Sequence, residues 1–137
     1  MKYDIRKRAI SKMIRSEDEE QMTVIEYCAV RRLPVVHIPN EGRRDPRTGA
    51  RLRAMGMSAG FPDLFFPAPR NGYHGLMIEM KAGYNKPTEK QLDWLSMLSA
   101  EGYKTAVCYG FDEAKNAIDE YFSINENGRN KNDRTNA

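Results

Sequence analysis

The 137 residues are enough for one domain with a hydrophobic core, and 40% hydrophobic with 30% charged residues is typical of a soluble globular protein. A net charge of +3 is too small to indicate a partner by itself, so the distribution of charge along the chain has to be considered. No apolar run approaches the roughly 18 residues of a membrane span, and the N-terminus lacks the apolar core of a signal peptide, which predicts a cytoplasmic protein without a membrane partner.

The first third of the chain predicts an arm, a helix and a short strand. Residues 1–15 are basic and weakly patterned, as expected of an N-terminal arm. The segment 16–32 reads as a helix, because Ser16 can cap it and acidic residues fill its first turn. Its apolar stripe at helical spacing consists of Met22, Ile25, Cys28 and Ala29. Pro34 ends this helix, and the β-branched residues after it predict a strand.

The segment 39–60 holds four glycines and two prolines, which predicts a long loop of the kind that is usually functional or disordered. Two apolar runs follow, 63–66 and 76–81, and the Pro-rich turn between them indicates a β-hairpin.

A second helix is predicted over 88–100, where Thr88 and Gln91 can form a capping box and Gly102 can follow the C-terminus. The core face of this helix is expected to consist of Leu92, Leu95 and Leu98, with Trp94 and Met97 beside them. A further strand (104–110) and a closing helix capped by Asp112 complete the order.

The element order α-β-β-β-α-β-α predicts an α/β fold with a mixed sheet of about four strands flanked by helices. We expect a folded domain over 16–124 and a disordered polar tail over 125–137. Cys28 and Cys108 lie inside apolar segments and are expected to be buried free thiols. With only these cysteines and two histidines, the usual zinc spacings are absent, so a bound metal would be held mainly by oxygen.

Three charged residues border the hairpin strands, where an unpaired buried charge is costly. Glu79 and Lys81 project to one face, because alternate residues of a strand do so. If the two strands pair antiparallel, Asp63 lies beside them. Two carboxylates can hold a hard divalent ion such as Mg²⁺, which polarises a phosphodiester, while a lysine orients water. The alternative is that Asp63 caps a turn while Glu79 and Lys81 form a solvated cross-strand pair.

Pro62-Asp63 followed by Glu79-Met80-Lys81, in this order of elements, resembles the PD-(D/E)xK nuclease superfamily and, more narrowly, the VRR-NUC family of virus-type replication-repair nucleases. The resemblance covers roughly 16–122 and implies a restriction-endonuclease-like αβββαβ core. Its matching features are the helical segment 17–21, HIPNEG (37–42), GMSAGFPDLFFP (56–67), YHGLMIEMK (73–81), and Gln91 with Trp94.

The resemblance implies an active site of Asp63, Glu79 and Lys81 that uses Mg²⁺ or Mn²⁺ and no organic cofactor. The carbonyl of Met80 is implied as a further ligand. An acidic residue of the first helix would complete the metal shell. Glu17 lies on nearly the same helical face as Ile25 and Cys28, whereas Glu20 directly precedes Gln21 as in the family's "EQ" pair, so both remain candidates. The alternative for both is a solvated first turn that stabilises the helix dipole.

Residues around this site are candidates for contacts with substrate. Gln91 would reach substrate or lysine, unless it serves only the capping box. Asn40 would touch the site or belong to a simple turn, and His37 is expected to be partly buried rather than a catalytic base. The segment 43–53 holds five arginines. It suits phosphate contacts, because a guanidinium group can bind phosphate through two hydrogen bonds. The alternative is a charged run that is only exposed to solvent. The predicted phosphate-binding residues are Arg43, Arg44, Arg47, Arg51, Arg53 and Lys86.

The resemblance implies a metal-dependent DNA endonuclease of phage or prophage type in a bacterial or phage-infected cell. Small members resemble homodimeric junction-resolving enzymes, so Holliday junctions or other branched DNA are the expected substrate. Two alternatives remain: a non-catalytic DNA-binding module on a nuclease fold, and a sequence-specific restriction-type nuclease.

Overall fold

A mixed four-stranded sheet organises the chain in this computed structural model, which describes residues 15–39, 45–125 and 127. The strand order is β1-β2-β3-β4. Strands β1 (Val36–His37), β2 (Leu64–Phe66) and β3 (Leu76–Lys81) pair antiparallel, and β4 (Lys104–Tyr109) runs parallel to β3. The predicted hairpin and the α/β class are therefore confirmed.

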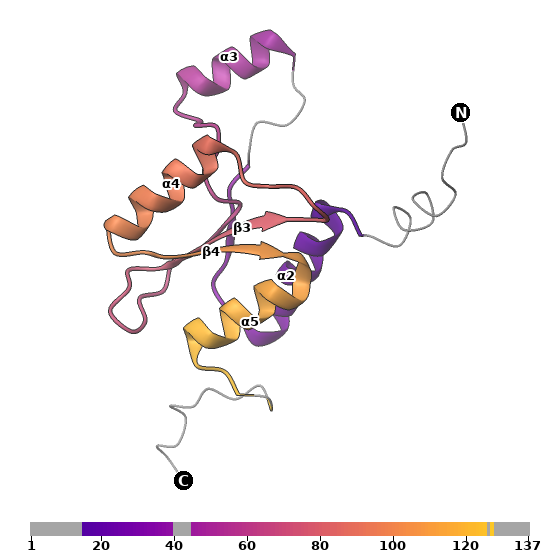
Figure 1. Ribbon diagram of the computed structural model, residues 1–137, viewed down its shortest axis with the longest axis vertical. Coiled ribbons are helices and arrows are strands. Elements are labelled where there is room, and N and C mark those ends of the chain that lie inside the picture. The colour runs from indigo at the N-terminus through magenta and orange to yellow at the C-terminus, as the bar shows by residue number, and fades with distance from the viewer. Residues whose placement is uncertain (1–14, 40–44, 126, 128–137) are drawn as a thin grey trace, which may run out of the picture.

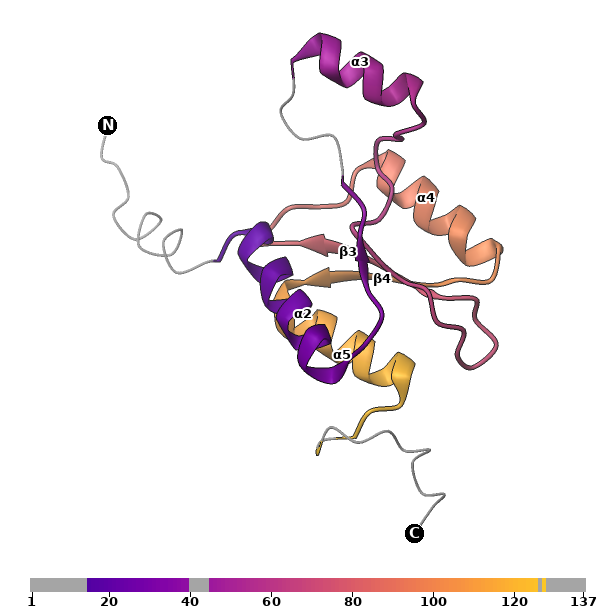
Figure 2. The ribbon, with the colours of Figure 1, turned by 180° about the vertical axis from the view of Figure 1, so that it is seen from behind.

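Helices cover both faces of the sheet. Helices α2 (Glu17–Arg31) and α5 (Gly110–Phe122) lie side by side on one face, and α4 (Glu89–Ala100) lies on the other (Figures 1 and 2). Every residue of β3 is buried, as expected of a central strand covered on both sides. The core between the sheet and the α2–α5 layer includes Val24, Leu64, Phe66, Ile78, Met80 and Ile118. No helix among the described residues is long and apolar enough to span a membrane.

The apolar stripes predicted for the two helices are wrong in part. On α2, Met22 is 58% exposed while Val24 is fully buried. On α4, Leu92 is half exposed, and the polar Gln91 is buried in its place. Which of two neighbouring residues is buried depends on how each helix is rotated against the sheet. This rotation is set by tertiary packing and cannot be read from the helical spacing alone. Ala29 is likewise exposed, while Cys28 and Cys108 are buried free thiols as predicted.

This correction on α2 gives a stability test. Val24→Ala is expected to lower the free energy of unfolding by about 2 kcal/mol, because it removes buried methyl groups and leaves a cavity. Met22→Ala, two residues away, is the matched control and is expected to change it by less than about 0.5 kcal/mol. Urea denaturation followed by circular dichroism measures both values, and an equal loss in the two variants would contradict the assignment of the buried face.

The segment predicted to be a long loop contains a helix, α3 (Pro46–Ala54). Asp45 caps it by accepting hydrogen bonds from the backbone N–H groups of Arg47 and Thr48, and Pro46 occupies the first turn, where its missing N–H costs nothing. In Figures 1 and 2 this helix stands away from the sheet and its covering helices.

The predicted cap of the closing helix is also wrong. Helix α5 begins at Gly110, so Asp112 lies in its first turn and not at its N-cap, and Tyr109 at the N-cap makes no side-chain capping bond. Instead, the carboxylate of Glu20 on α2 accepts a hydrogen bond of 2.8 Å from the backbone N–H of Phe111. One of the free N–H groups at the start of α5 is thus satisfied from a neighbouring helix.

Candidate active site

Strand pairing brings Asp63 and Glu79 together. In the β2–β3 register Leu64 lies opposite Ile78, so Asp63, one residue before, lies opposite Glu79 on the same face. Lys81 follows on that face, and its Nζ lies 3.7 Å from Glu79 Oε1. All three side chains are buried, with exposed fractions of 7%, 1% and 7% for Asp63, Glu79 and Lys81. The alternative of a solvated cross-strand pair is therefore excluded.

The Glu79 carboxyl group lies in a site that disfavours its charge. Burial and the neighbouring Asp63 carboxylate raise its pKa to about 8, against the opposing influence of Lys81. Its Oε1 accepts a hydrogen bond from Gln91, whereas its Oε2 is the only buried side-chain polar atom of the described residues without a hydrogen-bond partner. An ionised Glu79 thus presents one unsatisfied oxygen to the site.

Asp63 is fixed to the next strand through the backbone. Its Oδ2 accepts a hydrogen bond of 2.8 Å from the N–H of Met80. Burial raises the pKa of Asp63, although this bond and the Glu79 carboxyl group lower it. Because the N–H and C=O of a strand residue point to the same side, the Met80 carbonyl also faces the Asp63 side of β3.

These oxygens fit a hard divalent ion. Mg²⁺ and Mn²⁺ prefer carboxylate, carbonyl and water oxygens, and Mg²⁺ in particular keeps several waters, so two carboxylates suffice to anchor it. A positive charge at this point would also compensate the pair Asp63 and Glu79, whose ionisation burial opposes. No three His, Cys, Asp or Glu side chains within 15–39, 45–125 and 127 are clustered to hold a metal by themselves. A metal ion at this point would therefore depend on water and backbone oxygens besides the two carboxylates.

Gln91 forms the predicted capping box and also contacts Glu79, whereas its predicted contact with substrate or lysine stays a prediction. Its Oε1 accepts a hydrogen bond from the backbone N–H of Thr88, which completes the capping box of α4. Its Nε2 donates to Glu79 Oε1 at 2.9 Å. The start of α4 therefore orients the central carboxylate of the site.

The structure separates the two acidic candidates on α2. Glu17 is half-buried, and burial raises its pKa. Lys81 lowers this pKa and Asp63 raises it, so the carboxylate of Glu17 interacts with both charged groups of the site. Glu20 instead binds the start of α5 through Phe111.

Substitutions at these two positions should give opposite results. If the site cleaves DNA, as the family resemblance implies, Glu17→Gln is expected to reduce cleavage about tenfold or more, because it removes a negative charge beside Asp63 and Lys81. The variant should not lose stability, because burial disfavours the ionised form of Glu17. Glu20→Ala is expected to lower the free energy of unfolding by about 1 kcal/mol, because the α5 N-terminus loses its acceptor. Cleavage assays and urea denaturation on both variants measure the contrast. The same loss of cleavage from Glu20→Ala after correction for unfolded protein would contradict it.

His37 is exposed rather than partly buried, and it lies next to the site on β1. Its Nδ1 is 3.1 Å from the backbone oxygen of Asp63 and 3.0 Å from Nε2 of Gln21 on α2. Gln21 is thus connected to Asp63 through His37. In the sequence, the family's "EQ" pair was the only indication that Gln21 lies near the site. This contact links α2, β1 and the start of β2.

The predicted phosphate contacts are only partly described. Arg47, Arg51 and Arg53 lie on α3 and are exposed, and Lys86 is exposed in the connection from β3 to α4. The predicted residues Asn40, Arg43 and Arg44 lie outside the described residues. The described arginines belong to a capped helix, not to the long loop that the sequence predicted.

The mixed sheet with helices on both faces is a nuclease-type fold, as two comparisons with known proteins show. The sequence pattern of the VRR-NUC domain matches residues 7–112. A solved structure named VRR_NUC domain protein is 31% identical, with a TM-score of 0.68, and the alignment covers 80% of this chain and 90% of that one. The chain belongs to the VRR-NUC domain family. A search among curated proteins found no match.

Proposed function

We propose that this protein is a metal-dependent DNA endonuclease that hydrolyses phosphodiester bonds at the Asp63–Glu79–Lys81 site. The observation that carries the proposal is the buried pair of carboxylates with one unsatisfied oxygen, Glu79 Oε2, beside a buried lysine. A module that only binds DNA has no use for two buried carboxyl groups whose ionisation burial opposes, and whose charge, once they are ionised, repels phosphate. Membership of a nuclease family supports the same conclusion.

The ligands of a Mg²⁺ or Mn²⁺ ion would be Asp63, Glu79 and the Met80 carbonyl, with the charge of Glu17 nearby. Such an ion, when bound, polarises the scissile phosphodiester and stabilises the negative charge that develops on it. Lys81 Nζ, held on the same face as Glu79, orients the attacking water and adds positive charge near the phosphate. Gln91 holds the Glu79 carboxylate in position through its amide.

The arginines of α3 support a DNA substrate. Arg47 and Arg51 are exposed on a helix that stands away from the sheet (Figure 1), where a DNA backbone can approach it. A guanidinium group binds phosphate through two parallel hydrogen bonds. Such contacts fix the position of DNA without reading its bases, so we expect selection by shape, with Holliday junctions or other branched DNA as substrate. A homodimer of this chain would present two sites to the two symmetry-related strands of a junction.

A panel of labelled DNA molecules tests this proposal. Four-way junction, flap, single-stranded and linear duplex DNA are incubated with the protein in Mg²⁺, Mn²⁺ or EDTA. We expect cleavage of the branched molecules with either metal ion and none in EDTA. Equal cutting of linear duplex would contradict the selectivity, and cutting in EDTA would contradict the metal requirement. Light scattering on the same sample determines whether the active species is a dimer.

A further inference from the structure

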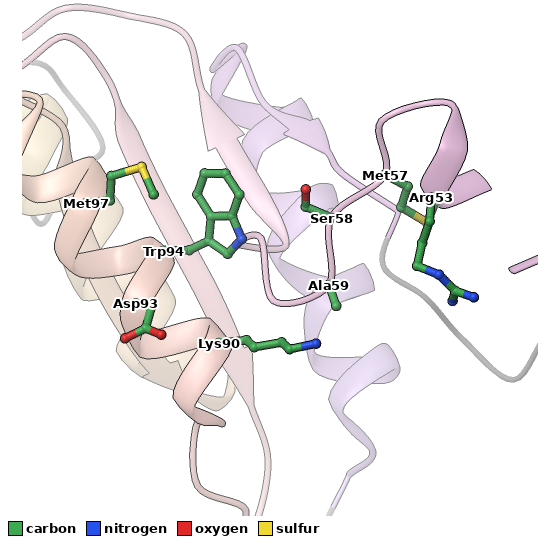
Figure 3. Close-up of a pocket in the computed structure, with 8 residues that line it drawn as sticks. All are labelled: Arg53, Met57, Ser58, Ala59, Lys90, Asp93, Trp94 and Met97. Carbon is green, nitrogen blue, oxygen red and sulfur yellow. The ribbon is translucent and has the colours of Figure 1, made fainter. Parts of the chain in front are cut away.

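A groove lined by apolar side chains and bordered by charged ones runs between the glycine-rich segment 56–61 and helix α4, beside the active site. One part, of about 420 Å³, is lined by Ile38, Pro39, Gly56, Met57, Ser58, Phe61 and Trp94. The other part, of about 450 Å³, shares Met57, Ser58 and Trp94 and continues along α4 to Met97 (Figure 3). Each volume lies within the range of roughly 300–1,000 Å³ that is usual for ligand pockets.

Tight packing fixes the shape of this groove. Gly60 has a φ of +86°, and a Cβ there would lie only 2.8 Å from the backbone of Lys90, so the segment lies directly on the first turn of α4. The rings of Phe61 and Trp94 pack edge to face with centroids 5.0 Å apart. Trp94 nevertheless remains half-buried, so part of its surface faces the groove.

The groove adjoins the active site through both of its walls. Phe61 precedes Asp63 by two residues on one wall, and Trp94 follows Gln91 by one helical turn on the other. A DNA strand whose phosphate lies at Asp63 and Glu79 would therefore carry a neighbouring nucleotide to the groove.

The chemistry of the lining matches a nucleotide. An aromatic ring beside cationic side chains is the arrangement with which proteins bind single-stranded nucleic acid, since bases stack on the ring and cations meet the backbone. Here Trp94 supplies the ring, and Lys90 and Arg53 border the same pocket (Figure 3). The Ser58 hydroxyl and the Asp93 carboxylate, also in the lining, can hydrogen-bond to the polar edge of a base. A purely apolar protein partner would leave these charged groups unmatched.

We propose that this groove binds one unpaired nucleobase next to the scissile phosphodiester, stacked against Trp94. This inference rests on the proposed function and makes it narrower: the substrate is branched DNA that offers an unpaired nucleotide beside the cut. Trp94 is the only tryptophan of the chain, so its fluorescence reports on this groove alone.

The test measures binding without cleavage. The full-length protein in EDTA is titrated with single-stranded DNA, duplex of the same length, and duplex with an unpaired tail, while the anisotropy of a label on the DNA and the emission of Trp94 are recorded. We expect the two molecules with unpaired bases to quench Trp94 and the duplex to leave it unchanged. Saturating single-stranded DNA without quenching would overturn the inference. Equal quenching by duplex would also overturn the inference. A shift of the Trp94 emission with protein concentration in the absence of DNA would overturn it too, because it would indicate that a second copy of the chain occupies the groove.

Variants separate stacking from folding. Trp94→Leu is expected to weaken binding of single-stranded DNA about tenfold and to leave duplex binding unchanged, while Trp94→Phe retains most of the affinity. Leu92→Ala, on the exposed side of the same helix, is the control and should bind as the wild type does. An equal loss for duplex, or no rescue by phenylalanine in a variant with a normal melting temperature, would contradict the inference. Cleavage in Mg²⁺ is assayed separately. Cleavage without quenching of Trp94 would refute only the binding of a base in the groove, and quenching without cleavage would refute only the proposed nuclease function.

Discussion

Asp63→Asn is expected to reduce DNA cleavage by about 10³-fold or more, because it removes one of the two carboxylates that we propose as ligands of the catalytic ion. The fold should survive this change, since the asparagine oxygen can still accept the hydrogen bond from the Met80 N–H. DNA binding should persist or become tighter, because a negative charge near the phosphates is lost. Gel assays of cleavage in Mg²⁺ and anisotropy titrations in EDTA measure the two effects.

Asp112→Asn provides the matched control for this substitution. Asp112 is exposed in the first turn of α5, and its replacement removes the same charge from the same chain. Normal cleavage by this control together with loss of cleavage by Asp63→Asn assigns the effect to the site. Cleavage by Asp63→Asn at the wild-type rate would contradict the mechanism.

Glu79→Gln is expected to abolish cleavage and at the same time to stabilise the metal-free protein above pH 8. The pKa of Glu79 is about 8 in the folded state, above its ordinary value of 4.5, so the folded protein holds a proton that the unfolded chain has released. The stability due to this proton is fully present below pH 4.5 and is lost as the pH rises through 8. Glutamine keeps a neutral group at this position at every pH, so the variant avoids the loss.

Thermal unfolding in EDTA at pH 5 and pH 8.5 measures this difference. At pH 5 we expect the wild type and Glu79→Gln to have similar melting temperatures. At pH 8.5 we expect the free energy of unfolding of Glu79→Gln to exceed that of the wild type by about 3 kcal/mol, which corresponds to about 10 °C in melting temperature for a chain of this size. Mg²⁺ should raise the melting temperature of the wild type at pH 8.5 and leave that of Glu79→Gln unchanged, because only the wild type binds it tightly. Glu26→Gln, an exposed change on α2, is the control. A variant less stable than wild type at pH 8.5 would contradict the argument.

Local rules were sufficient to predict the centre of this site. The alternation of side chains along a strand put Glu79 and Lys81 on one face, and the hairpin connection put Asp63 opposite them, as the β2–β3 register confirms. The capping box of α4 was also readable, since Thr88 and Gln91 are three residues apart. Both features depend only on residues close in sequence or on a single strand pairing.

Features that depend on contacts between distant elements could not be predicted in this way. The cap of α5 comes from Glu20, some ninety residues away, and no sequence pattern links the two. The second hydrogen bond of Gln91, to Glu79, likewise requires the relative position of α4 and β3. The choice between Met22 and Val24 as the buried residue of α2 depends on how the helix lies on the sheet.

Helix α3 was missed for a different reason. Its arginines and glycine suggested a solvated loop. The long glycine-containing segment was therefore interpreted as a loop, although the sequence contains a signal for the start of a helix. Asp45 followed by Pro46 is a strong helix start, because the aspartate caps free N–H groups and proline fits the first turn. The arginines consequently project from one helix, which supports their use as a surface for DNA phosphates.

The central claim is that Asp63 and Glu79 together hold a divalent ion at the end of β3. Crystals grown with Mn²⁺ test it directly, because the anomalous signal of manganese locates the ion independently of any assay. We predict an anomalous peak between the carboxylates of Asp63 and Glu79, on the side of Glu79 Oε2, and no such peak for Glu79→Gln. An empty site in wild-type crystals of a protein that cleaves DNA in Mn²⁺, or a peak at other ligands, would contradict the claim.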